Sequence, residues 1–236
     1  KAVIPYFTTE REPFLEYDLT KLVYTLATLD RPIIGVVARL PVEGGFMMGQ
    51  RPVPPWAVIN QIRELFDVRS MPAEFNSVPP EVGELLLVHP KNLSEETLYA
   101  IDQFVMRGGR ILAFIDPNAE TEMPTPGTRP GPSDIDRLLK SWGVTFIKDK
   151  VAGDLETARR VNVRYQGQMT QVDYVAWNAM DRKNLNTDDA VVADIRGINV
   201  GSAGIIEPAK DATTTFRPLI TTSEKSQAID VAKFQG

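Results

Sequence analysis

The pattern of apolar and polar positions is clearest over residues 85–117, where it predicts a strand, a helix and a second strand. Leu85–Val88 is an apolar run without alternation, which is typical of a strand covered on both faces. Ser94 is expected to cap the helix that follows, and Gly108 and Gly109 to stop it. Ile111–Ile115 is a second apolar run. Two buried strands joined by a helix run parallel, so this segment predicts a parallel sheet.

The same succession of strands and helices extends over residues 33–147 and predicts a doubly wound α/β sheet of flavodoxin-like order. An amphipathic helix over 14–29 precedes it and is expected to pack on the sheet. Ser133, three residues before Asp136, resembles a capping box for a short helix that ends at Gly143. The remaining elements expected here are the strand Ile33–Ala38, a Gly- and Pro-rich loop over Arg39–Pro55, a helix from Pro55, and short strands at Asp67–Met71 and Val144–Ile147.

Beyond residue 150 the chain changes character, with short β-like runs and few helical stripes. The tail over 223–236 is polar and is expected to be frayed. We therefore divide the chain into a leading segment with its helix (1–31), a flavodoxin-like or amidotransferase-like α/β domain (32–150) and a β-rich C-terminal part (151–236). The expected strands of that last part are Val161–Tyr165, Gln171–Trp177, Ala190–Ile195, Ile198–Ile206 and Phe216–Thr222.

Composition limits the classes of function. Of 236 residues 43% are hydrophobic, which suffices for a large core. The net charge of -5 gives little support to nucleic-acid binding, and the absence of cysteine excludes disulfides, thiolate metal sites and cysteine nucleophiles. No apolar run reaches the roughly 18 residues of a membrane span. Because the chain opens on Lys1, we interpret it as an excised soluble piece whose removed flanks carried targeting or membrane segments.

Polar side chains follow three of the expected strands. In an open α/β sheet, ligands bind beyond the carboxyl ends of the strands, so these side chains are candidates for a binding site. The candidates are Arg39 and Glu43 after the first strand, His89 and Lys91 after the third, and Asp116 and Asn118 after the fourth.

The candidate chemistry has simpler alternatives. His89, the one histidine, would act with Asp116 as a general base, but no Gly-x-Ser-x-Gly elbow accompanies it, and we favour a loop histidine that binds neighbouring backbone. For Asp116-Pro117 we favour a turn in which Asp116 caps its own backbone. Metal-ligand spacing is missing, and the glycines between Glu43 and Gly49 lack the spacing of a phosphate loop, so no metal and no cofactor is expected.

Three segments carry a family resemblance: FTTEREPFLEYDLTKLVYTL (7–26), VHPKNLSEETLYAIDQFVMRGGRILAFIDP (88–117) and FRPLITTSE (216–224). Together they resemble the auxiliary component of an uncharacterised ABC-type transport system, a family named for bacterial gliding motility. The resemblance implies a membrane-anchored subunit with an extracytoplasmic region at the periplasmic face of the inner membrane, and an ABC permease and ATPase as partners. It also implies a distant likeness to glutamine-amidotransferase folds, whose cysteine would fall near His89 and is missing here.

We therefore expect a non-enzymatic accessory domain of an ABC transporter that binds a solute or a partner protein. A second hypothesis is a carbohydrate- or glycan-binding module, which rests on the polar groups at the strand ends and on scattered aromatic residues. A third is a hydrolase that uses His89 and Asp116.

Overall fold

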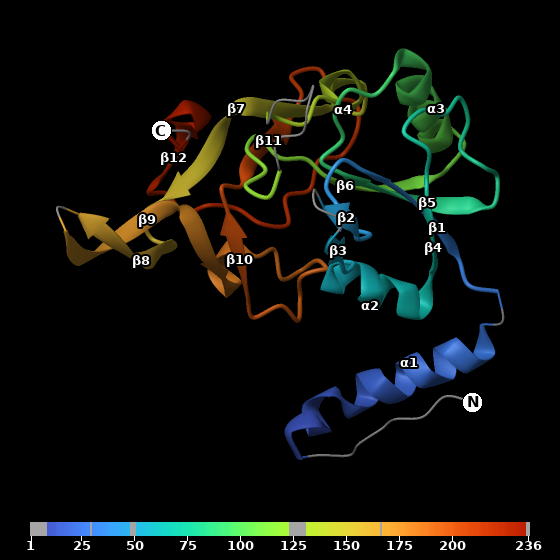
Figure 1. The fold of residues 1–236 in the computed structure, drawn as a ribbon, viewed down its shortest axis with the longest axis horizontal. Coiled ribbons are helices and arrows are strands. Elements are labelled where there is room, and N and C mark those ends of the chain that lie inside the picture. Colours follow the sequence, from blue (N-terminus) through green and yellow to red (C-terminus); the bar gives the residue numbers. More distant parts are fainter. Residues whose placement is uncertain (1–8, 29, 48–50, 123–130, 166, 235–236) are drawn as a thin grey trace.

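A four-stranded parallel sheet forms the centre of the α/β part of this computed structural model, which describes residues 9–28, 30–47, 51–122, 131–165 and 167–234. The strand order is β4-β1-β5-β6, and all neighbours pair in parallel (Figure 1). This confirms a mixed α/β fold with a parallel sheet. The strands are β1 (Ile33–Ala38), β4 (Asp67–Ser70), β5 (Val82–Val88) and β6 (Arg110–Phe114).

Helices cover both faces of this sheet (Figure 1). On one face, Leu85 and Leu87 of β5 pack with α3 and α4 in the larger apolar core, which also holds Phe104. On the other face, Leu86 and Val88 pack with Ile59 of α2. Successive side chains of β5 enter opposite cores, which is why its apolar run shows no alternation. The helices are α2 (Ala57–Leu65), α3 (Glu95–Met106) and α4 (Asp136–Ser141).

The predicted helix after β5 is confirmed at both ends. The Ser94 side chain accepts a hydrogen bond from the backbone amide of Thr97 at 3.2 Å, as an N-cap residue does. Gly108 follows the helix with a φ of 95°, and the Gly109 amide bonds to the Phe104 carbonyl. Local sequence signals alone therefore predict where this helix begins and ends.

β6 corrects one expectation from the apolar pattern. Ile111 and Ala113 pack against the larger core, but Leu112 and Phe114 on the other face are 57% and 55% exposed. Because β6 is the edge strand and α2 packs over β1 and β5, the outer half of this face is uncovered. The strand was expected to be buried on both sides, and it is buried on one.

The strand expected at 144–147 does not extend the parallel sheet. It begins β7 (Val144–Asp154), which pairs antiparallel with β11 (Gly204–Pro208) and β12 (Ser226–Asp230). A further sheet has the order β10-β9-β8. The flavodoxin-like order thus stays a prediction, and β7 runs through the proposed boundary at residue 150. The strands of the further sheet are β8 (Ala158–Tyr165), β9 (Gln168–Asp181) and β10 (Gly197–Gly201).

Five other expectations are corrected. The single strand expected at 198–206 is divided between β10 and β11, which belong to different sheets. Residues 190–195 form turns, and the segment 216–222 holds only an isolated bridge between Ile220 and Leu185. The polar tail instead carries β12 and the short helix η3 (Val231–Phe234), with Ile229 and Val231 buried. The Gly- and Pro-rich loop contains an antiparallel pair, β2 (Gly45–Met47) and β3 (Arg51–Val53). Another short helix, η2 (Arg182–Asn184), follows β9.

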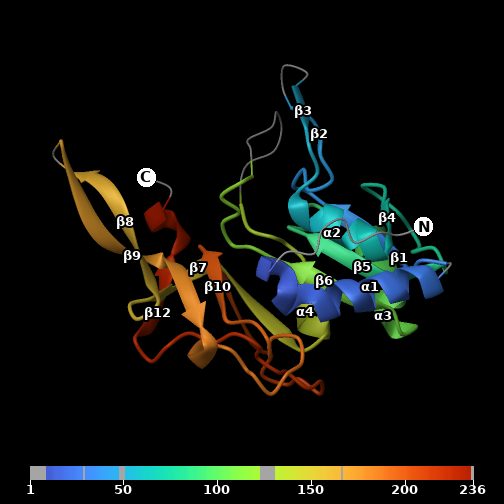
Figure 2. The same ribbon diagram turned by 90° about the horizontal axis from the view of Figure 1, so that it is seen from below.

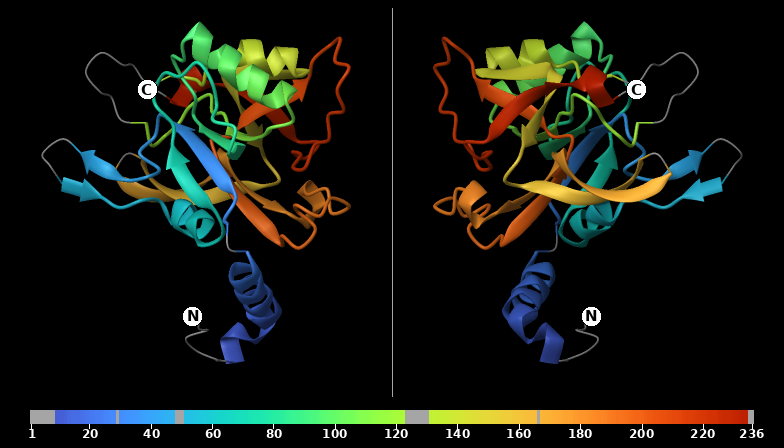
Figure 3. Two further views of the ribbon diagram at one scale, coloured as in Figure 1. Left: turned by 90° about the vertical axis from the view of Figure 1, so that its right-hand side faces the viewer. Right: turned by 90° about the vertical axis from the view of Figure 1, so that its left-hand side faces the viewer.

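The leading helix forms as predicted but does not pack on the sheet. The short helix η1 (Thr9–Phe14) leads into α1 (Leu15–Ala27), which has no buried residue and projects from the rest of the chain (Figures 1 and 3). In the view from below, α1 lies in front of the parallel sheet (Figure 2). Lys21 of α1 pairs with Glu64 of α2. Leu19, Val23 and Leu26 are exposed. Within the described ranges, no helix is long and apolar enough to cross a membrane.

Candidate functional site

The turn after β5 places His89 in an unusual backbone conformation. Its φ is 48°, a left-handed value that costs a non-glycine residue of the order of 1 kcal/mol. The His89 amide donates to the Phe114 carbonyl at 2.8 Å, which joins the carboxyl ends of β5 and β6. The side chain is 1% exposed. The turn therefore directs the imidazole into the protein.

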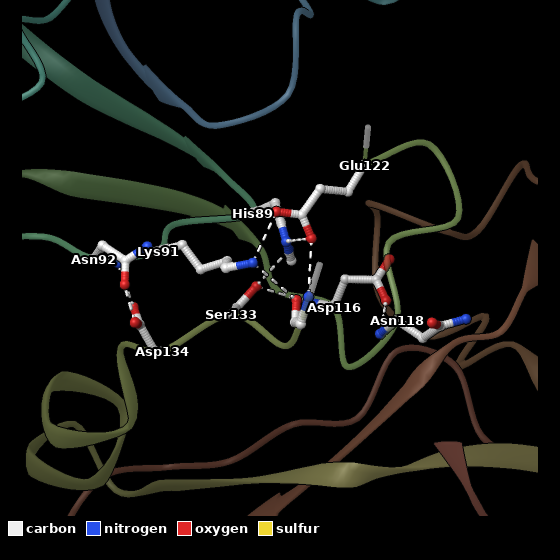
Figure 4. A network of polar contacts seen from close by, with 9 residues as sticks. His89, Lys91, Asn92, Asp116, Asn118, Glu122, Ser133 and Asp134 are labelled. Carbon is white, nitrogen blue, oxygen red and sulfur yellow. Dashed lines mark hydrogen bonds and ion pairs between the residues drawn. The ribbon is translucent and has the colours of Figure 1, made fainter. Parts of the chain in front are cut away.

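Ser133 connects the ends of β5 and β6 (Figure 4). Its Oγ lies 3.0 Å from His89 Nδ1 and accepts a hydrogen bond from the Asp116 amide at 3.0 Å. The capping box expected at Ser133 is absent, because α4 begins after Ile135 without a side-chain cap. Ser133 is fully buried, so its hydroxyl holds the two strand ends together.

Glu122 and Lys91 both lie beside His89 (Figure 4). Glu122 Oε1 accepts from Lys91 Nζ at 2.7 Å, and Glu122 Oε2 accepts from the Gly131 amide at 3.0 Å. Burial by itself would raise the pKa of Glu122, but these two hydrogen bonds and the positive charge of Lys91 outweigh it and lower that pKa. Glu122 is therefore held as a carboxylate beside His89 and Lys91, which follow β5.

The tautomer of His89 follows from its neighbours. When the Ser133 hydroxyl donates to Nδ1, a neutral His89 carries its proton on Nε2. That atom is buried and lies 3.4 Å from Glu122 Oε2, longer than an ordinary hydrogen bond. Within the described residues, the ring faces Ser133 and Glu122, and no hydrogen bond joins it to the Asp116 carboxylate.

Asp116 has the turn geometry that its sequence predicts. Its Oδ1 accepts from the Asn118 amide at 2.7 Å. Burial raises the pKa of Asp116, and the charge of Glu120 raises it further, against the opposing effects of the Asn118 amide and His89. No Lys or Arg of the described residues pairs with this carboxylate. Asp116 is thus a half-buried carboxylate that pairs with no Lys or Arg of the described residues.

Two of the three predicted strand ends converge. His89, Lys91 and Asp116 gather around Ser133 and Glu122, and Asn118 caps the turn beside them. The pair from the first strand lies apart: Arg39 is exposed, and Glu43 pairs with Arg63 and Ser70. Whether any of the six binds a ligand stays a prediction.

A cleft of about 810 Å³ opens beside this cluster, along the uncovered face of β6. Its floor holds Leu86 and Val88 of β5, and α2 forms one side. Across the cleft lie Val200 of β10 and Ile206 of β11. His89, Asp116, Asn118 and Glu120 lie at its polar end. The lining is mostly aliphatic and aromatic, as in sites for small molecules.

Sequence reasoning missed the residues that join this polar end to the C-terminal strands. Glu120 Oε1 accepts from Trp177 Nε1 at 3.0 Å and from the buried Ser202 hydroxyl. It also missed Glu122 and Ser133. Their side-chain partners are 31 to 82 positions distant in the chain, so no local spacing signals these contacts.

The comparison with known families agrees with the expected kinship. A family model described as an ABC-type uncharacterized transport system matches residues 31–235. Two of the segments that carry the resemblance, 88–117 and 216–224, fall within the match, whereas 7–26 lies outside it. No curated protein and no solved structure matches the chain. The chain therefore belongs to the family of auxiliary components of an uncharacterized ABC-type transport system.

Proposed function

We propose that this chain is a non-enzymatic, extracytoplasmic accessory domain of an ABC transporter, and that it binds a solute or a partner protein of the transporter. The observation that carries the proposal is family membership over residues 31–235. An auxiliary component of a transport system associates with the transporter. The permease and the ATPase are the partners that follow from this role.

The cleft along β6 supports a binding role. It combines an apolar lining with a few polar groups at the carboxyl edge of a parallel sheet, the usual position of ligands in α/β folds. The buried groups nearby support binding more than catalysis, because Ser133 is fully buried and already engaged with His89 and the Asp116 amide. A glycan has less support, since aliphatic side chains dominate the lining.

A strain lacking the full-length gene tests the transport role. Uptake or export of candidate substrates by the cognate transporter should fall in this strain and recover when the gene is restored. Unchanged transport across the candidate substrates would contradict the proposal. Co-purification of the permease and ATPase with the tagged full-length protein tests the partners. Cleavage by a protease added outside the inner membrane tests the extracytoplasmic position.

A further inference from the structure

The uncovered face of β6 carries large apolar side chains. In a stable core, other elements would cover side chains of this kind. Leu112 and Phe114 point away from the larger core, and Ile206 of β11 is 49% exposed across the cleft. Large apolar side chains that remain accessible within a concave site mark a place where something else binds. The exposure follows from the strand order, because β6 is the edge strand and no described helix packs over its outer face.

The polar end of the cleft is acidic. Asp116 and Glu120 lie there beside Asn118 and His89, and no Lys or Arg is among the described residues that line the cleft. Burial raises the pKa of Asp116 and the charge of Glu120 raises it further, against the opposing effects of the Asn118 amide and His89. A cation bound between the two carboxylates would relieve their repulsion and offset the partial burial of Asp116. Charge complementarity therefore favours a positively charged group at this end.

The dimensions of the cleft favour a small molecule over a macromolecule. Its volume of about 810 Å³ lies within the range of about 300–1,000 Å³ that is usual for small-ligand sites. The apolar strip along β6 and the acidic end lie side by side, so one amphiphile can reach both. A ligand with charge at one end and hydrocarbon at the other matches this arrangement.

We propose that the cleft binds an amphiphilic organic cation, with its apolar body along Leu112 and Phe114 and its ammonium group beside Asp116 and Glu120. This inference rests on the proposed accessory role and specifies the class of solute. Asp116 keeps its turn bond to Asn118 and offers its other carboxylate oxygen to the cation. The aliphatic walls supply the area that is removed from water on binding.

Calorimetric titration of the chain with decylamine, decanol and decanoate tests the proposal, because the three probes share one hydrocarbon body. Decylamine should bind tightest and decanoate weakest. Asp116→Asn keeps the acceptor for the Asn118 amide and removes the charge, so it should weaken decylamine binding about tenfold. It should leave decanol binding within about twofold, since an uncharged headgroup gains little from a carboxylate.

Two further variants separate the apolar part from the charged part. Leu112→Ser should weaken both decylamine and decanol about tenfold, since it removes buried hydrocarbon area. The matched controls are Met106→Ser, a 74% exposed residue of α3, and Asp173→Asn on β9. Neither control residue lines the cleft, so both variants should bind decylamine as the unchanged chain does.

Several results would overturn the inference: no decylamine binding, equal binding of the three probes, or Asp116→Asn without effect. A concentration-dependent dimer that Leu112→Ser abolishes would assign the cleft to a second copy of the chain and would also overturn it. These outcomes are distinct from failure of the accessory role. The titrations use the purified chain alone, whereas the accessory role is tested by transport in the deletion strain.

Discussion

The indole Nε1 of Trp177 donates a hydrogen bond to Glu120 Oε1 at 3.0 Å, between β9 and the loop that follows β6. The same oxygen accepts from Ser202, which lies just beyond β10. Glu120 therefore joins the end of the parallel sheet to the antiparallel strands. The cleft is lined by residues of both parts, and Glu120 is one of them.

Replacement of Glu120 should loosen this junction. Glu120→Ala removes the acceptor for two donors, one of them the buried Ser202 hydroxyl, and should lower the free energy of unfolding by about 1–3 kcal/mol. Glu120→Gln keeps an acceptor oxygen and should retain more of the stability. Urea unfolding measures both variants. Equal midpoints for Ala and Gln would show that the acceptor does not contribute.

Ser133 is expected to contribute to stability through its hydroxyl. Ser133→Ala leaves His89 Nδ1 and the Asp116 amide without their partner in a buried site, which should cost about 1–3 kcal/mol. The control is Ser141→Ala, at an exposed position where the hydroxyl donates only to the Leu138 carbonyl of its own helix. Urea denaturation should separate the two variants clearly. A control as unstable as Ser133→Ala would contradict the prediction.

Asp154 makes stability depend on pH in the acid range. Burial would raise the pKa of Asp154, but hydrogen bonds from the Ser223 amide and hydroxyl and from the Glu156 amide outweigh it and lower that pKa. The stabilisation is therefore fully present above the ordinary pKa of 3.8 and is lost as the pH falls through the lowered pKa. Unfolding measured from neutral to acid pH should show this loss.

The matched variant removes that dependence. In Asp154→Asn an amide NH₂ replaces one of the acceptor oxygens facing Ser223, so the free energy of unfolding at neutral pH should drop by about 1.5–3 kcal/mol. The loss of stability with acid should be correspondingly smaller. Asp188→Asn, at an exposed position, serves as the control and should keep the acid dependence of the unchanged chain.

Two glycines of the α/β part should respond oppositely to alanine. A Cβ at Gly109 would lie 2.4 Å from ring atoms of Phe104, a buried residue of α3. Gly109→Ala should therefore destabilise the chain by about 1–3 kcal/mol. A Cβ at Gly83 meets nothing within 4 Å, so Gly83→Ala should be neutral or slightly stabilising. Thermal unfolding of the pair checks the prediction, which fails if the two midpoints shift together.

Removal of residues 1–30 should leave the remaining chain folded. No residue of α1 is buried, and its ion pair between Lys21 and Glu64 is partly exposed. Such a pair contributes at most about 1 kcal/mol, so the free energy of unfolding should change by no more than that. Circular dichroism and urea unfolding of the truncated chain measure this. A large loss of stability would show that α1 packs on the body in solution.

The sequence by itself determined the elements whose signals are local. The apolar run of β5, the Ser94 cap and the glycines after α3 lie within a few residues of what they control, and the structure has them as predicted. The turn of Asp116 onto the Asn118 amide is equally local. Helix spacing, caps and tight turns depend on contacts between near neighbours, which a one-dimensional pattern records.

Only the tertiary structure decided which elements meet. The apolar pattern of a strand does not identify the strand that it pairs with. The pattern at 144–147 predicts a fifth parallel strand, but this segment pairs antiparallel with β11 and β12. Ser133 matched a capping box, yet it bonds to His89, 44 positions away. The cleft exists because β6 lies at a sheet edge opposite β10 and β11. Long-range packing assembles such sites, and local hydrophobic periodicity carries no information about it.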